Sequence, residues 1–368
     1  MVERMAVEGL TALAGVREQD GAKRLLRAAL ADGPAHAYLF HGPPGVGKRA
    51  LALAFAGELL GDSGRVEREV HPDLYVFAPL GEQIRVDDIQ ALRRDLHLRP
   101  FEASRRVYII ESAELLNHDA SDALLTSLEE PPAYAVVILV ASRPQMLALT
   151  IRSRCQHVAF TLLSRAAVAD WLLSSNPELD TSDAERIARL AGGKLDRAAR
   201  LVDPDLAGRR ERLIELARST YAPVPFDPRA AMRGVLDAAA ASGERARERA
   251  RQTADDSLTR RELEQRERRA ARGAERDDVA DSLEILAGWY RDVVAVAAGA
   301  RDAVLNADRL VELELDAGAL PDRSAARAAE ILLETQRMLE LQVQLDLTLD
   351  ALFVRLRRAV RPQLAANS

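Results

Sequence analysis

The stretch that decides the fold reads HGPPGVGKR and occupies residues 41–49. It follows the apolar run 37–40 and leads into the run 50–56, whose alanines and leucines favour a helix. A glycine-rich loop between a strand and a helix is typical of a phosphate-binding loop. The sequence therefore predicts such a loop here, and a plain glycine turn without a ligand is the alternative.

Each residue type in this loop has a physical task. Gly42, Gly45 and Gly47 let backbone N–H groups turn inward, and the start of the following helix adds partial positive charge. Lys48 is expected to reach the terminal phosphates of a nucleotide. Arg49 stands where the motif has Ser or Thr, whose hydroxyl holds Mg²⁺. We therefore expect Mg²⁺ to be poorly held, and the sequence leaves open whether ATP, ADP or no nucleotide occupies the loop.

A second departure lies after the apolar run 106–110, which has the form of a central parallel strand. In phosphate-loop ATPases, this strand ends in an acid that holds Mg²⁺, and a second acid often polarises the attacking water. Here Glu111 takes the first position, but Ser112 takes the second. Glu114 comes a turn later and is not assumed to replace the missing acid. We expect the chain to hydrolyse no ATP of its own.

Composition limits the class of protein. The chain has 368 residues, enough for two or three domains, and it is 48% hydrophobic but only 4% aromatic, which indicates an aliphatic core. A net charge of −6 argues against a protein that coats nucleic acid by bulk charge. The single cysteine, Cys155, excludes a disulfide framework and a cysteine-rich zinc site, and we expect it to be a small buried residue. No metal site is expected, and without a signal or membrane segment we expect a cytoplasmic protein with no membrane partner.

The order of apolar runs predicts the architecture. Buried-type strand candidates alternate with helical segments, which indicates a doubly wound parallel sheet of five strands. They occupy residues 37–40, 74–77, 106–110, 136–140 and 157–160. Beyond residue 160 we expect only helices: short ones at 164–174, 183–191 and 195–202, then a helical remainder from about 206. Two details are also expected: Asp87 as a helix N-cap, and the charged run 244–278 as either a long solvated helix or a mobile loop.

Several motifs together resemble the clamp-loader subunits of bacterial DNA polymerase III, the AAA+ proteins that open a sliding clamp and close it on primed DNA. They are GPPGVGK at 42–48, LEEPP at 128–132 and TIRSRC at 150–155. Motor subunits of this family, gamma/tau, have Thr after the lysine, an Asp-Glu pair after the central strand and an arginine in the lid. This chain has Arg49, then Glu111 with Ser112, and GKLD at 193–196 with Arg197 one place late. It is therefore most similar to the delta-prime type, which has a degraded site of its own.

The resemblance implies three domains: an AAA+ phosphate-loop domain at 1–160, a three-helix lid at 161–204 and a helical collar for oligomerisation at 205–368. It implies gamma/tau and delta subunits as partners, with the sliding clamp and primed DNA reached through the assembled complex. The family's usual zinc-binding cysteines are missing from 61–71, so no zinc is expected.

By the same resemblance, Arg154 corresponds to the arginine finger that enters a neighbouring subunit's ATP site. The simpler alternative is a surface arginine paired with an acid of its own domain. The competing function is that of a catalytically active, gamma/tau-like ATPase subunit.

Overall fold

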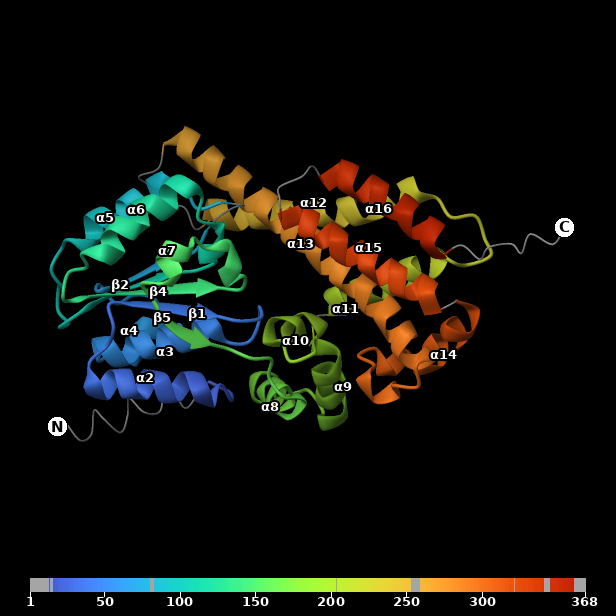
Figure 1. Ribbon diagram of the computed structural model, residues 1–368, viewed down its shortest axis with the longest axis horizontal. Helices are drawn as coiled ribbons and strands as arrows, with labels where there is room; N and C mark the ends of the chain where they lie inside the picture. The colour runs from blue at the N-terminus through green and yellow to red at the C-terminus, as the bar shows by residue number, and fades with distance from the viewer. Residues whose placement is uncertain are drawn as a thin grey trace. The chain divides into compact units, whose positions relative to one another are not determined.

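The computed structural model describes residue 13 and residues 16–79, 83–202, 204–252, 259–320, 322–340 and 345–360. The chain divides into two compact units, with the boundary between Ala199 and Arg200. The first unit contains the sheet and the second is helical (Figure 1). Among the described residues, no helix is long and apolar enough to cross a membrane.

The first unit is built on a fully parallel sheet with the strand order β2-β3-β4-β1-β5. The strands are β1 (Ala37–His41), β2 (Leu74–Phe77), β3 (Arg106–Ile110), β4 (Ala135–Ala141) and β5 (Gln156–Ala159). The three central strands are almost completely buried because helices cover both faces of the sheet. The predicted five-stranded parallel sheet is confirmed.

Alternation along the strands separates two cores. Tyr38 and Phe40 of β1 face the helices α2 (Asp20–Asp32) and α3 (Lys48–Leu60), whereas Leu39 faces the opposite side. That opposite side is covered by α5 (Val86–Leu96), α6 (His118–Glu129) and α7 (Leu149–Arg152). Successive side chains of a strand point to opposite faces, so one buried strand supplies both cores.

Three short helices follow the sheet, as predicted: α8 (Arg165–Ser175), α9 (Thr181–Ala191) and α10 (Leu195–Val202). The N-cap of α8 is Ser164, whose hydroxyl accepts from the backbone N–H of Ala167. The N-cap of α9 is Asp180, whose carboxylate accepts from the backbone N–H of Asp183. Gly192 ends α9 in the left-handed conformation that favours glycine. We call the segment from Thr161 to Val202 the lid.

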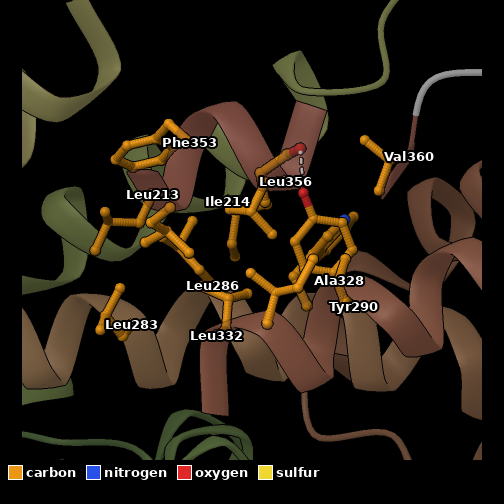
Figure 2. Close-up of a cluster of buried hydrophobic side chains, with 14 of the residues drawn as sticks. Leu213, Ile214, Leu283, Leu286, Tyr290, Ala328, Leu332, Phe353, Leu356 and Val360 are labelled. Atoms are coloured by element: carbon orange, nitrogen blue, oxygen red, sulfur yellow. Dashed lines mark hydrogen bonds between the residues drawn. The ribbon is translucent and has the colours of Figure 1, made fainter. Parts of the chain in front are cut away.

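The second unit is a bundle of helices around an aliphatic core. Its long helices are α11 (Pro204–Ser219), α12 (Pro228–Gln252), α13 (Arg260–Ala297), α14 (Leu310–Ala319), α15 (Asp322–Glu340) and α16 (Leu345–Val360). Figure 2 shows Leu286 of α13, Leu332 of α15 and Leu356 of α16 meeting in this core. The buried Tyr290 hydroxyl is satisfied by Thr220 Oγ1 at 2.6 Å and by the Ala217 carbonyl at 3.1 Å. An α/β phosphate-loop domain followed by helical parts is the fold class that the sequence predicts.

Two local predictions are wrong. The N-cap of α5 is Arg85 and not Asp87, because the Asp88 carboxylate, three residues on, accepts from the Arg85 backbone N–H at 2.9 Å. The charged run 244–278 is not one continuous solvated helix. Residues 244–252 and 260–278 belong to α12 and α13, which pack against each other and bury Glu267 and Asp278, while residues 253–258 lie outside the described part of the chain.

Candidate functional site

The phosphate loop joins β1 to α3 and has the conformation that its glycines permit. Gly42, Gly45 and Gly47 all have positive φ, at 144°, 72° and 90°. A Cβ on Gly42 would lie 2.3 Å from the Phe160 carbonyl oxygen, so only glycine lets the loop pass the end of β5 this closely. The predicted strand, loop and helix are therefore present at residues 37–60.

Lys48 is buried and points back into its own loop. Its Nζ donates to the carbonyls of Gly42 at 2.8 Å and Pro43 at 2.5 Å, and to Ser142 Oγ at 3.1 Å. Burial lowers the pKa of Lys48 to about 8, because the ammonium has lost water, and the charges of Glu114 and Asp196 partly oppose this. All three ammonium protons have acceptors within the chain.

Glu114 lies close to this lysine, although sequence spacing alone did not assign it a place in the site. It belongs to the short 3₁₀ helix η1 (Ala113–Leu115) that follows β3. Its Oε1 accepts from the Ser142 backbone N–H at 2.9 Å, while its buried Oε2 has no hydrogen-bond partner. The only sequence signal for this position is an acid one turn after the central strand.

Arg49 and Glu111 are brought together as an ion pair. The Arg49 Nε donates to a carboxylate oxygen of Glu111, and its Nη2 donates to Glu69 Oε1 at 2.5 Å. The guanidinium thus neutralises the acid that Mg²⁺ would need, and Ser112 supplies no second carboxylate. These residues do not fit a magnesium site. Among the described residues, no three His, Cys, Asp or Glu side chains are grouped so that they could hold a metal ion.

The start of α10 lies on the phosphate loop. The Leu195 backbone N–H donates to the Gly45 carbonyl at 2.6 Å. The next side chain, Asp196, is so close that its Oδ1 would be 1.7 Å from a Cβ built on Gly45. The sequence showed only that the lid arginine is missing here, and the contact between Asp196 and the loop comes from the structure.

Arg154 sits in the turn between α7 and β5, away from the phosphate loop. The turn is anchored by the buried side chains of Ile151 and Cys155 on either side of the arginine. Its Nη2 is 2.7 Å from Glu129 Oε1, its Nη1 donates to the Thr150 carbonyl at 3.0 Å, and its side chain is 36% exposed. Within this chain, Arg154 therefore pairs with an acid of its own domain.

Cys155 is buried, as predicted, and burial raises the pKa of its thiol to about 12. A thiol with so high a pKa is not a nucleophile near neutral pH. Its side chain serves to anchor the turn that carries Arg154.

The curated relatives match about half of the chain. Residues 18–164 match the family model described as "DNA polymerase III, delta subunit". The delta-prime subunit of Pseudomonas aeruginosa is 35% identical over an alignment of 196 residues, which covers 49% of this chain and 60% of that protein. The delta-prime subunit of Bacillus subtilis is 32% identical over an alignment of 210 residues, which covers 53% of this chain and 62% of that protein. The chain thus spans about three fifths of the length of these relatives.

A tau subunit also matches. The tau subunit of Bacillus subtilis is 30% identical over an alignment of 199 residues, which covers 49% of this chain and 35% of that protein. Among solved structures, a DNA polymerase III gamma subunit-related protein from Thermotoga maritima matches with a TM-score of 0.45 and 19% identity. The match covers 92% of this chain and 99% of the Thermotoga maritima chain. The sequence of this chain is therefore similar to DNA polymerase III subunits of the delta-prime and tau types, and the family match covers residues 18–164.

Proposed function

We propose that this chain is a noncatalytic subunit of the DNA polymerase III clamp loader and helps to load the sliding clamp onto primed DNA. It completes a ring with gamma/tau and delta subunits as a stator, with residues 205–368 as its collar. It gives Arg154 in trans to the ATP of a neighbouring gamma/tau-type subunit. It is a cytoplasmic protein, as its replication relatives suggest.

The position of Arg154 supports the role in trans. A finger needs a guanidinium that is fixed at its base and free at its tip, because it stabilises charge on a transferred phosphoryl group that another subunit holds. Ile151 and Cys155 fix the base. The tip is held by a pair with Glu129, in which both side chains are more than one third exposed. Such a pair contributes roughly 0–1 kcal/mol, and the exposed bond to the Thr150 carbonyl adds about 1 kcal/mol, so Arg154 can leave both for a phosphate at modest cost.

The chain's own loop supports the noncatalytic part of the proposal. Hydrolysis needs a metal between the phosphates and an acid that positions water. Arg49 pairs with Glu111 at the metal position, and Ser112 provides no carboxylate. No observation favours the alternative of an active gamma/tau-like ATPase.

The test is ATP hydrolysis by the loader reconstituted from this chain and its own partners, with clamp and primed DNA. We expect Arg154→Ala to slow the site that it serves by about a thousandfold, while the ring still assembles. Arg186→Ala is the matched control, because Arg186 forms a similarly exposed ion pair with Asp183 on the lid at 2.8 Å. The isolated chain should release no phosphate. Full activity of the Arg154→Ala ring, or turnover by the isolated chain, would refute the proposal.

A further inference from the structure

We infer that Asp196 is a built-in anion that keeps nucleoside triphosphates out of the phosphate loop of this chain. The inference concerns the chain's own loop, and it stands or falls separately from the role of Arg154.

The first step is the position of the carboxylate. In a phosphate loop, the glycine backbone lies against the phosphates of the ligand. Here the Asp196 Oδ1 lies against Gly45. It is so close that any residue with a Cβ at position 45 would clash with it. Its negative charge is also felt by Lys48, whose pKa it raises against the effect of burial. A polyphosphate entering the loop would meet a carboxylate of the same sign near the glycines that should bind it.

The second step is that the lid is tied to the loop at several points. The Leu195 N–H bond to Gly45 fixes the start of α10 directly beside Asp196. On the other side of the loop, Gln19 Nε2 donates to the carbonyls of Val46 at 3.4 Å and Thr161 at 2.8 Å. Its Oε1 accepts from the Thr161 backbone N–H at 3.1 Å. Through these bonds the almost fully buried Gln19 links the phosphate loop to the beginning of the lid.

The residues before Gln19 continue this attachment. Arg17 Nη2 donates to Ser174 Oγ of α8 at 2.9 Å, and Glu18 accepts from the Ser164 backbone N–H at 3.0 Å. The hydrogen bonds from Ser164 lower the pKa of Glu18, so it is charged near neutral pH. The lid is therefore held from both ends, with Asp196 on the loop.

The third step is that the rest of the loop still has the form that binds phosphate. The three glycines keep positive φ angles, and α3 begins directly at Lys48, so the start of this helix lies at the loop as in a phosphate-binding loop. Neutralising Asp196 should therefore create affinity where the native chain has little.

The experiment is a titration of the purified full-length chain with a fluorescent ATP analogue and with inorganic tripolyphosphate, each with and without magnesium. We expect Asp196→Asn, which keeps the shape of the side chain, to bind at least tenfold more tightly than the native chain. Asp196→Ser should behave in the same way and covers the case in which the asparagine variant folds poorly. Glu185→Gln, an equal charge change at an exposed position of α9, should gain nothing. Adding Lys48→Met to Asp196→Asn should remove the gain.

Three results would overturn the inference. The first is that the native chain binds the ATP analogue as tightly as Asp196→Asn does. The second is that neither Asp196 variant gains affinity for the analogue or for tripolyphosphate. The third is that Glu185→Gln gains as much affinity as the Asp196 variants. None of these outcomes depends on the loader's ATPase rate, so they leave the Arg154 proposal to its own test.

Discussion

Lys48 should titrate far below an ordinary lysine, and the structure gives the size of the effect. Its pKa is lowered from 10.5 to about 8, chiefly because the ammonium is buried among loop carbonyls. This difference corresponds to about 3 kcal/mol between the charged and the neutral side chain. Glu114 and Asp196 act in the opposite direction, and without them the pKa would fall further.

Glu114→Gln isolates the larger of these two opposing charges. The amide oxygen of glutamine can still accept from the Ser142 backbone N–H, so the local hydrogen bond is kept while the charge is removed. Loss of a nearby opposite charge shifts a pKa by about 1 or more. We expect the pKa of Lys48 to fall from about 8 toward 7 in this variant.

The assay is NMR of chain labelled with ¹³C at the lysine Cε, recorded from pH 6 to 11. The chain has only three lysines, Lys23, Lys48 and Lys194, so the signals can be assigned by single substitutions. Glu130→Gln, at an exposed acid, is the control and should leave Lys48 unchanged. A native Lys48 that titrates near 10.5, or a Glu114→Gln variant with an unchanged or higher pKa, would refute the reasoning.

The same shift has a consequence for stability. Between about pH 8 and 10.5, the unfolded chain holds a proton on Lys48 that the folded chain has released. The free energy of unfolding of the first unit should therefore rise with pH across this window. Urea unfolding of native chain and Lys48→Met, compared at pH 7.5 and 9.5, separates this effect from other groups that titrate. An equal pH dependence in the two proteins would contradict the expectation.

Two further substitutions test the surroundings of the site. The buried Asp73 carboxylate accepts from the backbone N–H groups of residues 101–103 at 2.6, 2.9 and 2.9 Å, so Asp73→Ala should cost about 3–5 kcal/mol. Hydrogen exchange followed by mass spectrometry should then show lost protection in the peptide 97–106, and native protection there would count against this role. Arg49→Thr removes two exposed ion pairs worth about 2 kcal/mol together at most, so it should lower the melting temperature only slightly. It should also give no phosphate release, because Ser112 still lacks a carboxylate, and measurable turnover would contradict the account of this site.

The fold was predictable where the signal is local. The phosphate loop needs three glycines at fixed spacing between an apolar strand and a helix, and all of this lies within residues 37–56. Likewise, β4 is a run of seven buried residues, which its apolar sequence indicates directly. The N-cap of α5 was mispredicted because two acids, Asp87 and Asp88, stand next to each other at the start of the helix. Spacing alone could not decide whether an aspartate is itself the N-cap or accepts, from the third helical position, the backbone N–H of an N-cap residue before it.

The site was less predictable because its decisive contacts join distant parts of the chain. Gly45 and Asp196 are 151 residues apart in sequence, and nothing in the motif GKLD indicates that its aspartate would lie on the loop. The pairing of Arg49 with Glu69 also depends on how α4 (Ser63–Glu67) and the turn after it pack against α3. For Arg49, the sequence revealed only the missing hydroxyl, whereas the structure shows that the arginine neutralises Glu111.

These contacts supply the phosphate loop with counter-charges from within the chain. Lys48 and Arg49 place two positive charges side by side at the start of α3, whose N-terminus is itself partly positive. In an ATPase, the phosphates of the nucleotide balance such charges. Here acids of the chain do so: Glu111 and Glu69 pair with Arg49, while Glu114 and Asp196 favour the charged form of Lys48. A loop with its own counter-ions needs no nucleotide to balance its charge, and removal of Asp196, the counter-ion that lies against Gly45, should create a place for a polyphosphate.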